Sequence, residues 1–166
     1  MSSLLRLVQL LAIVVWVGGI VFFAFVLAPV SFHTLPSVHL AGAVVGAALK
    51  VFDVIGLGCG IAFLFATALL YAQSPMRLKG RYELEFLLTG AMVIATAYLH
   101  WAILPAMDRD RVQAGGDVAS SALNNPARLD FDRLHKRSEH TEGAILLVGL
   151  GVVFLLSREE AQPVGL

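Results

Sequence analysis

Residues 10–30 read LLAIVVWVGGIVFFAFVLAPV, and no charged side chain interrupts these 21 positions. An α-helix rises about 1.5 Å per residue, so this run is long enough to cross a hydrocarbon core of about 30 Å. The apolar part of a cleaved signal peptide is shorter, about 7 to 15 residues, and small residues follow it at the cleavage site. The run therefore predicts a helix that spans a membrane.

Two more runs of this kind follow. Residues 54–72 are 19 positions without a charge, and residues 86–107 are 22 positions interrupted only by His100. Hydrophobic residues make up 58% of the 166 residues, charged residues only 14%, and the mean hydropathy is +0.80. Soluble domains contain about 45–50% apolar residues, so this composition indicates a chain that lies mostly in lipid.

The fourth apolar run is shorter. Residues 143–156 are 14 positions, or about 21 Å of helix, which does not cross a bilayer alone. A spanning helix has to begin near Arg137, which draws Glu139, His140 and Glu142 toward or into the membrane. The alternative is a locally thinned bilayer with snorkelling side chains.

The predicted fold is therefore all-α: a polytopic membrane protein with an antiparallel four-helix transmembrane bundle. We expect one domain over residues 1–166, with helices at about 4–30, 53–73, 83–107 and 131–157. A Leu35-Pro36 break followed by Gly42 and Gly46 predicts a short interfacial or re-entrant helix after the first span, between Ser31 and Lys50. The prolines at 29, 36 and 105 are expected to mark helix ends.

Charge and motifs exclude several functions. Lys+Arg and Asp+Glu are 12 each, so no basic excess points to nucleic acid. Cys59 is the only cysteine, and the sequence contains no Walker A loop, GxSxG, HExxH or CxxC motif. We therefore expect no enzyme. The bilayer is the predicted partner, and small-xxx-small pairs such as Gly42 with Gly46 fit a helix-packing protein partner or a homo-oligomer.

The orientation follows from the connections. Residues 73–82 carry Arg77, Lys79 and Arg81 without an acid, and short basic loops stay cytoplasmic. The chain is thus predicted to be a multi-pass protein of the cell membrane (inner or plasma) with both termini cytoplasmic. Six basic residues at the opposite end weigh against this orientation: Arg109, Arg111, Arg128, Arg133, Lys136 and Arg137.

Polar residues gather toward one membrane face in this topology, whichever way the chain inserts. All five histidines fall there: His33, His39, His100, His135 and His140. His100 lies 14 residues beyond Phe86, and Glu142 lies 14 residues before Leu156, so both are about 21 Å from the far side. Asp53 is about 28 Å from that side, close to the near interface.

Helical phase gathers polar side chains on one face of the third helix and one face of the fourth, and these two faces could meet inside the bundle. At about 100° per residue, Thr89, Thr96 and His100 share one face of the third helix, and His135, Ser138, Glu139 and Glu142 share one face of the fourth. Such residues in a membrane normally face a partner or a wet cavity.

Four residues form the candidate site: Asp53, His100, His135 and Glu142. Imidazole and carboxylate together suit a transition-metal ion, which is the one cofactor that the residues suggest, and they also suit a proton relay. The predicted function is the binding or passage of a small cation near one membrane face. In the alternative, the protein is a scaffold, and these residues are interfacial anchors and interhelical hydrogen bonds.

Several motifs resemble a known family. These are Trp16-Val17-Gly18-Gly19, Leu35-Pro36, Pro105 and the run Phe131 to Ser138, which contains Phe-x-x-x-His-x-x-Ser. Together they resemble the transmembrane protein 205-like family, a domain of unknown function, and the arrangement is distantly similar to the membrane domain of copper-resistance D proteins. The resemblance implies a small four-helix membrane protein, and the second likeness implies histidines that handle copper. Glu142 stands where the first family often has Asn.

Overall fold

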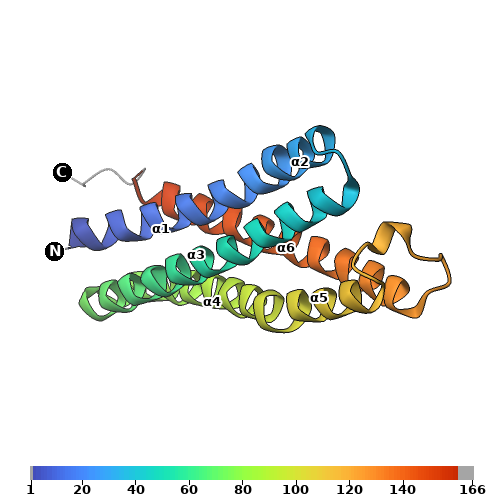
Figure 1. Ribbon diagram of the computed structural model, residues 1–166. Coiled ribbons are helices and arrows are strands. Elements are labelled where there is room, and N and C mark those ends of the chain that lie inside the picture. The colour runs from blue at the N-terminus through green and yellow to red at the C-terminus, as the bar shows by residue number, and fades with distance from the viewer. Residues whose placement is uncertain (1, 161–166) are drawn as a thin grey trace.

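The structure is a computed structural model that describes residues 2–160, and every regular element in this part of the chain is helical (Figure 1). The first span consists of α1 (Ser2–Phe22), a π-helical turn η1 (Phe23–Leu27) and α2 (Ala28–Thr34). The second is α3 (Val38–Gln73). The third consists of α4 (Met76–Tyr98), the π-helical turn η2 (Leu99–Ile103) and α5 (Leu104–Gln113). A short 3-10 turn η3 (Val118–Ser120) precedes the fourth, α6 (Pro126–Glu160).

The four spans form an antiparallel bundle, which confirms the predicted fold class. In a ring, α1 packs on α3, α3 on α4, α4 on α6, and α6 on α1. The start of α1, the turn between α3 and α4, and the end of α6 lie at one end of the bundle (Figure 1). The connections α2–α3 and α5–α6 lie at the other end. The four spans therefore run up and down in alternation, as the four apolar runs predict.

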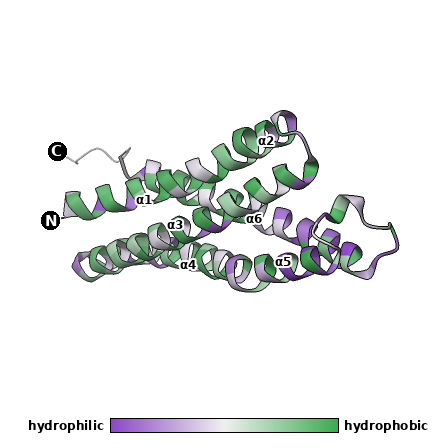
Figure 2. Ribbon diagram, viewed as in Figure 1, coloured by the Kyte–Doolittle hydropathy of each residue, from purple (hydrophilic) through white to green (hydrophobic). Residues whose placement is uncertain are grey.

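The outer surface of the bundle is apolar. Within residues 2–160, four helical stretches are long and apolar enough to cross a membrane: Ser2–Thr34, Val38–Gln73, Leu78–Gln113 and Pro126–Arg158. Large apolar side chains on these stretches point outward, among them Phe25, Phe65 and Ile94. Figure 2 shows the hydrophobic colouring along the spans and hydrophilic residues concentrated around α5 and the beginning of α6. An apolar surface of this extent indicates that lipid surrounds the bundle, so the chain is a multi-pass membrane protein.

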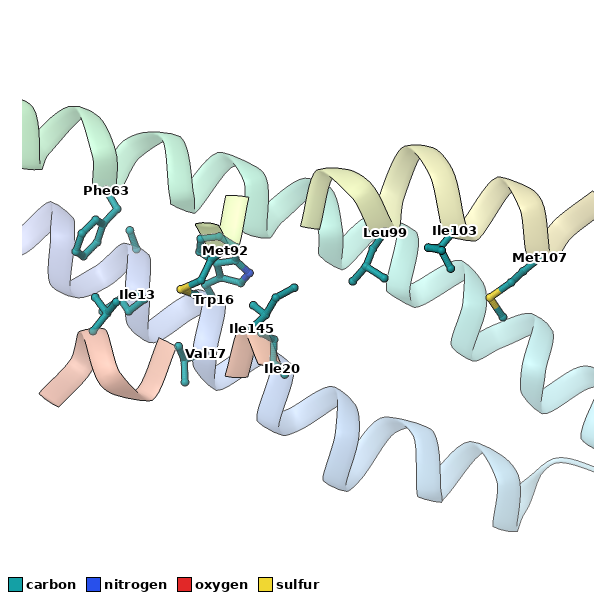
Figure 3. Close-up of a cluster of buried hydrophobic side chains, with 12 residues drawn as sticks. Ile13, Trp16, Val17, Ile20, Phe63, Met92, Leu99, Ile103, Met107 and Ile145 are labelled. Atoms are coloured by element: carbon teal, nitrogen blue, oxygen red, sulfur yellow. The ribbon is translucent and has the colours of Figure 1, made fainter. Parts of the chain in front are cut away.

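Trp16 of α1 is the central side chain of the core (Figure 3). It packs against Gly56 and Gly60 of α3. A Cβ atom on Gly56 would lie 2.5 Å from Nε1 of Trp16, and one on Gly60 would lie 2.4 Å from Cγ2 of Val93. Both distances are shorter than van der Waals contact. Gly56 and Gly60 have small-xxx-small spacing, and in this bundle the pair lets α1 and α4 pack closely on α3.

The region after the first span differs from the expectation. Residues 38–50 are not a separate interfacial or re-entrant helix, because they are the first turns of the 36-residue helix α3. Ser37 caps this helix by accepting a hydrogen bond from the backbone N–H of Leu40. The sequence predicts that the separate helix ends at Lys50. In the structure the Lys50 ammonium donates to the Asp108 carboxylate of α5, so this charge is paired at the side of α3 and does not interrupt the helix.

Pro36 separates α2 from α3 as expected, whereas the prolines at 29 and 105 do not end their spans. Each is the second residue of a helical segment that continues directly from a π-helical turn, η1 or η2. Proline lacks an N–H and its ring clashes with the carbonyl four residues earlier. Widening the preceding turn to a π-helix relieves this clash without breaking the helix.

Candidate functional site

An acid and a histidine meet inside the bundle. Oδ2 of Asp53, on α3, lies 3.5 Å from Nδ1 of His100, on η2. The Asp53 side chain is 2% exposed, and that of His100 is 21% exposed. Within the described chain, neither of these two atoms has a hydrogen-bond partner. The contact is thus an electrostatic one between two polar atoms whose hydrogen-bonding capacity no other described residue satisfies.

Glu142 adds a second carboxyl group to this pair. It lies on α6, is partly buried, and interacts electrostatically with Asp53. Three different helices therefore contribute two carboxyl groups and one imidazole. An ionised side chain at the centre of a bilayer costs about 2.5–3.5 kcal/mol on insertion scales, so a group of this kind calls for a compensating positive charge.

The π-helical turn sets the position of His100. η2 contains one residue more per turn than an α-helix, and it lies immediately before the segment that holds Pro105. The ring of Trp101 packs edge-on against the imidazole, with centroids 5.2 Å apart, and Trp101 itself is exposed toward lipid. Single π-turns occur frequently at functional sites, and this one carries the histidine of the buried pair.

His135 lies apart from the other three predicted residues. Its ring stacks on Phe131, with centroids 6.1 Å apart, and its Nε2 is 3.3 Å from Oε1 of Glu139 on the same helix. The His135 side chain is 53% exposed. It shares a helix face with Glu142 but is seven residues nearer the beginning of α6, which is about 10 Å. Among the side chains that the structure describes, no three or more of His, Cys, Asp or Glu form a group that could hold a metal ion.

A second polar cluster lies at the other end of the bundle, and the sequence analysis did not single it out. Glu85 of α4 is 0% exposed and accepts a 2.8 Å hydrogen bond from Nε of Arg81. Nε2 of Gln9, on α1, donates to Oε2 of Glu85 at 3.3 Å and to the Thr67 hydroxyl of α3 at 2.8 Å.

This second cluster joins all four spans, because Arg81 also donates to the carbonyl of Leu155 on α6, at 2.7 Å. Gln9 and Glu85 each lie one position before an uncharged run, so counting apolar residues places them outside the membrane. Helical phase was the signal that could have found Glu85, since it stands four residues before Thr89 on the inward face of α4.

A third group of charges lies where α3 meets α5. Lys50 donates to Asp108, and Nη1 of Arg111 is 3.4 Å from the same carboxylate. The guanidinium of Arg111 also lies over the ring of Phe131 at 5.4 Å from its centroid. Lys50 and Asp108 are both more than 40% exposed, so their pairing belongs to the membrane surface and contributes little stability.

The fold and this polar interior define a class: multi-pass membrane proteins built as four-helix bundles with ionisable groups inside. The chain belongs to the DUF4149 family, a domain of unknown function, whose model matches residues 11–115. This stretch contains Asp53, Arg81, Glu85 and His100, whereas Glu142 and His135 lie beyond it. Comparisons with curated proteins and with solved structures found no match.

Proposed function

We propose that this protein binds a proton within the membrane and holds it among Asp53, His100 and Glu142. The observation that carries the proposal is the pair of atoms Oδ2 of Asp53 and Nδ1 of His100, which lie 3.5 Å apart without another hydrogen-bond partner in residues 2–160. A proton placed between them satisfies both atoms at once. Burying such atoms without a partner is costly, so their arrangement favours an occupant.

Charge balance supports a proton as that occupant. Asp53 and Glu142 interact electrostatically, and two carboxyl groups that do so in a medium of low polarity repel each other when both are ionised. A proton bound at this site removes one negative charge and leaves the imidazole as donor or acceptor to the other acid. Histidine suits this role because its charge changes between about pH 5 and 8 when it is unperturbed.

A transition-metal ion is the second candidate occupant. Imidazole and carboxylate are donors that zinc, copper, nickel and iron accept, and the distant likeness to copper-resistance D membrane domains points the same way. The transmembrane protein 205-like resemblance carries no activity to add. A proton is preferred because it needs only the two atoms that face each other, whereas His135, the fourth predicted metal ligand, pairs with Glu139 instead.

The proposed role is binding rather than catalysis, in the cell membrane, with both termini cytoplasmic. The turn between α3 and α4 lies at the same end of the bundle as the start of α1 and the end of α6. Its sequence carries three basic residues and no acid between residues 73 and 82. The positive-inside tendency supports placing this end in the cytoplasm.

A scaffold function is favoured by a different observation. A Cβ atom on Gly42 would meet nothing within 4 Å, and one on Gly46 would reach only a side-chain nitrogen of Arg111, at 4.0 Å. This small-residue pair at the beginning of α3 is therefore not used inside the bundle and is open to a neighbouring helix. Replacing both glycines with leucine and measuring the oligomeric state in detergent tests this alternative, since a scaffold or homo-oligomer would dissociate.

Infrared spectroscopy of protein reconstituted in lipid at neutral pH tests the proton site. A protonated carboxyl group has its own carbonyl-stretch band, and ordinary exposed acids are ionised at this pH. We expect such a band in the wild type and its loss in Asp53→Asn and Glu142→Gln. Glu139→Gln is the matched control, because Glu139 lies on the same helix as Glu142 but is exposed, and it should leave the band unchanged.

Metal analysis of the same preparations separates the two occupants. The wild type could lack the band but carry near-stoichiometric zinc or copper. If that metal is lost in His100→Ala and kept in His135→Ala, the occupant of the site is a metal ion and not a proton. Wild type with neither a band nor a metal would refute a site at these residues.

A further inference from the structure

Polar side chains continue along the inward face of α4 between the two buried clusters. Glu85, Thr89, Thr96 and His100 follow one another at intervals of four, seven and four residues, which keeps them on one side of a helix. Glu85 and Thr89 are 0% exposed, and Thr96 is 2% exposed. Two hydroxyl groups thus stand inside the bundle on the line between two sets of ionisable groups.

These two hydroxyls differ from others on the spans. Five hydroxyl groups donate to the backbone carbonyl four residues earlier on their own helix: those of Ser31, Thr34, Thr67, Ser74 and Thr141. That bond is the usual solution for a hydroxyl in a membrane helix. Thr89 and Thr96 do not make it, and their Oγ1 atoms have no hydrogen-bond partner among the described residues. Their hydroxyls are therefore available to something inside the bundle.

Among the described side chains, four buried atoms lack a partner. Oγ1 of Thr89, Oγ1 of Thr96 and Nδ1 of His100 lie on this line, and Oδ2 of Asp53, on α3, faces Nδ1 of His100 at its end. Buried polar atoms of native proteins are satisfied by protein groups or by ordered water. Unsatisfied atoms scattered over a core would suggest separate local defects. Three atoms on one helix face, with a fourth that meets the last of them, suggest a shared occupant, and a file of water molecules has the required donors and acceptors.

A partly exposed side chain lies at each end of the line. The side chain of Arg81, which pairs with Glu85, is 23% exposed, and that of His100 is 21% exposed. Glu85 and His100 are 15 residues apart, or about 22 Å along the helix, out of a hydrocarbon core of about 30 Å. The stripe therefore covers most of the thickness that a proton has to cross.

Met92 interrupts the stripe. It stands between the two threonines, is 1% exposed, and belongs to the same buried cluster as Trp16 (Figure 3). A Cβ atom on Gly149 of α6 would lie 3.1 Å from its terminal Cε atom, so Met92 fills the space up to that helix. Methionine has a flexible, unbranched side chain, and hydrophobic constrictions gate water-filled paths in membrane proteins. Met92 closes the line in this conformation.

We propose that the inward face of α4 is a hydrated path for protons, which leads from the Asp53–His100 pair past Thr96 and Thr89 to Glu85, with Met92 as its gate. This inference rests on the proposed function, because it takes the proton bound at Asp53 and His100 as the one that moves. It extends that function from binding a proton to conducting it between the two ends of the bundle.

Proton flux into liposomes tests the path. Purified protein is reconstituted in vesicles that enclose a pH-sensitive dye, and a potassium gradient with valinomycin drives protons inward. We expect the wild type to conduct and Thr89→Val and Thr96→Val to conduct at least about tenfold less, because valine keeps the shape of threonine and removes the donor to water. Thr141→Val is the matched control and should conduct like the wild type, since Thr141 is bonded to its own helix. Met92→Ala should conduct faster.

The outcomes separate this inference from the proposed function. Wild type that shows the protonated carboxyl band but passes no protons would overturn the path and leave the binding site standing. Conduction by both valine variants at the wild-type rate would overturn the path as well. A wild type without the carboxyl band would refute the proton-binding site, and the path that rests on it would fall with it. Variants are compared only when they elute as single species and melt within a few degrees of the wild type.

Discussion

Replacing Glu85 with alanine is expected to destabilise the bundle by about 3.6 kcal/mol. Removing one partner of a buried ion pair costs about 3–5 kcal/mol, because the remaining charge is left without compensation. The guanidinium of Arg81 is 23% exposed and keeps its bond to the carbonyl of Leu155, which places the expected cost at the lower limit. The lost bond from Gln9 adds about 0.6 kcal/mol, an average value for membrane helices.

Reversible unfolding of the purified protein in mixed micelles measures this change. Glu83→Gln serves as the control, because Glu83 is exposed and should cost no more than about 0.5 kcal/mol. In a double-mutant cycle, Arg81→Ala with Glu85→Ala should lose less than the sum of the single changes, by about 0.5–3 kcal/mol. A Glu85→Ala protein as stable as the Glu83→Gln control, or strict additivity in the cycle, would refute the buried pair.

Three other predictions concern packing, the π-turn and orientation. Gly60→Ala should destabilise the bundle by about 1–3 kcal/mol in the same unfolding assay, whereas Gly58→Ala, which would meet nothing within 4 Å, should not. Pro105→Ala should let η2 return to an α-helix, which rotates the His100 imidazole by about 100°. The protonated carboxyl band should then disappear. A retained band would show that Pro105 does not position His100 in the site. In a cysteine-free background, a membrane-impermeant thiol reagent applied outside cells should label a cysteine at Ala119 and not one at Gly80, and the reverse pattern would invert the proposed orientation.

The uncharged runs predict the number and direction of the spans because membrane helices have a fixed minimum length. They predict the ends of the helices poorly. The sequence predicts that the second helix begins at Asp53, yet α3 begins at Val38, because a helix continues beyond the apolar run when its charges are paired at its side. The fourth helix begins at Pro126, where Asn125 accepts a hydrogen bond from the N–H of Ala127.

Depth puts His100 level with Glu142 and puts Asp53 about 7 Å nearer the interface. The structure instead puts Asp53 in contact with His100. Phase alone grouped His135 with Glu142, but the two are separated along α6, and a nearby acid on the same helix takes the histidine. The cluster of Gln9, Arg81 and Glu85 was missed for a physical reason. Arg81 and Glu85 are four residues apart on α4, but Gln9 meets Glu85 and Thr67 from α1, and Arg81 meets Leu155 on α6. These partners on other helices are visible only once the helices are packed.

The central claim is that Asp53 and His100 share a proton, and solid-state NMR of ¹⁵N-histidine-labelled protein in lipid tests it most directly. The ring nitrogen shifts report which nitrogen of His100 carries a proton and whether that proton is hydrogen-bonded. We predict a strongly hydrogen-bonded Nδ1 resonance that is absent from His100→Ala and changes in Asp53→Asn, while Glu139→Gln leaves it unchanged. A His100 resonance that is identical in the wild type and in Asp53→Asn would contradict the claim.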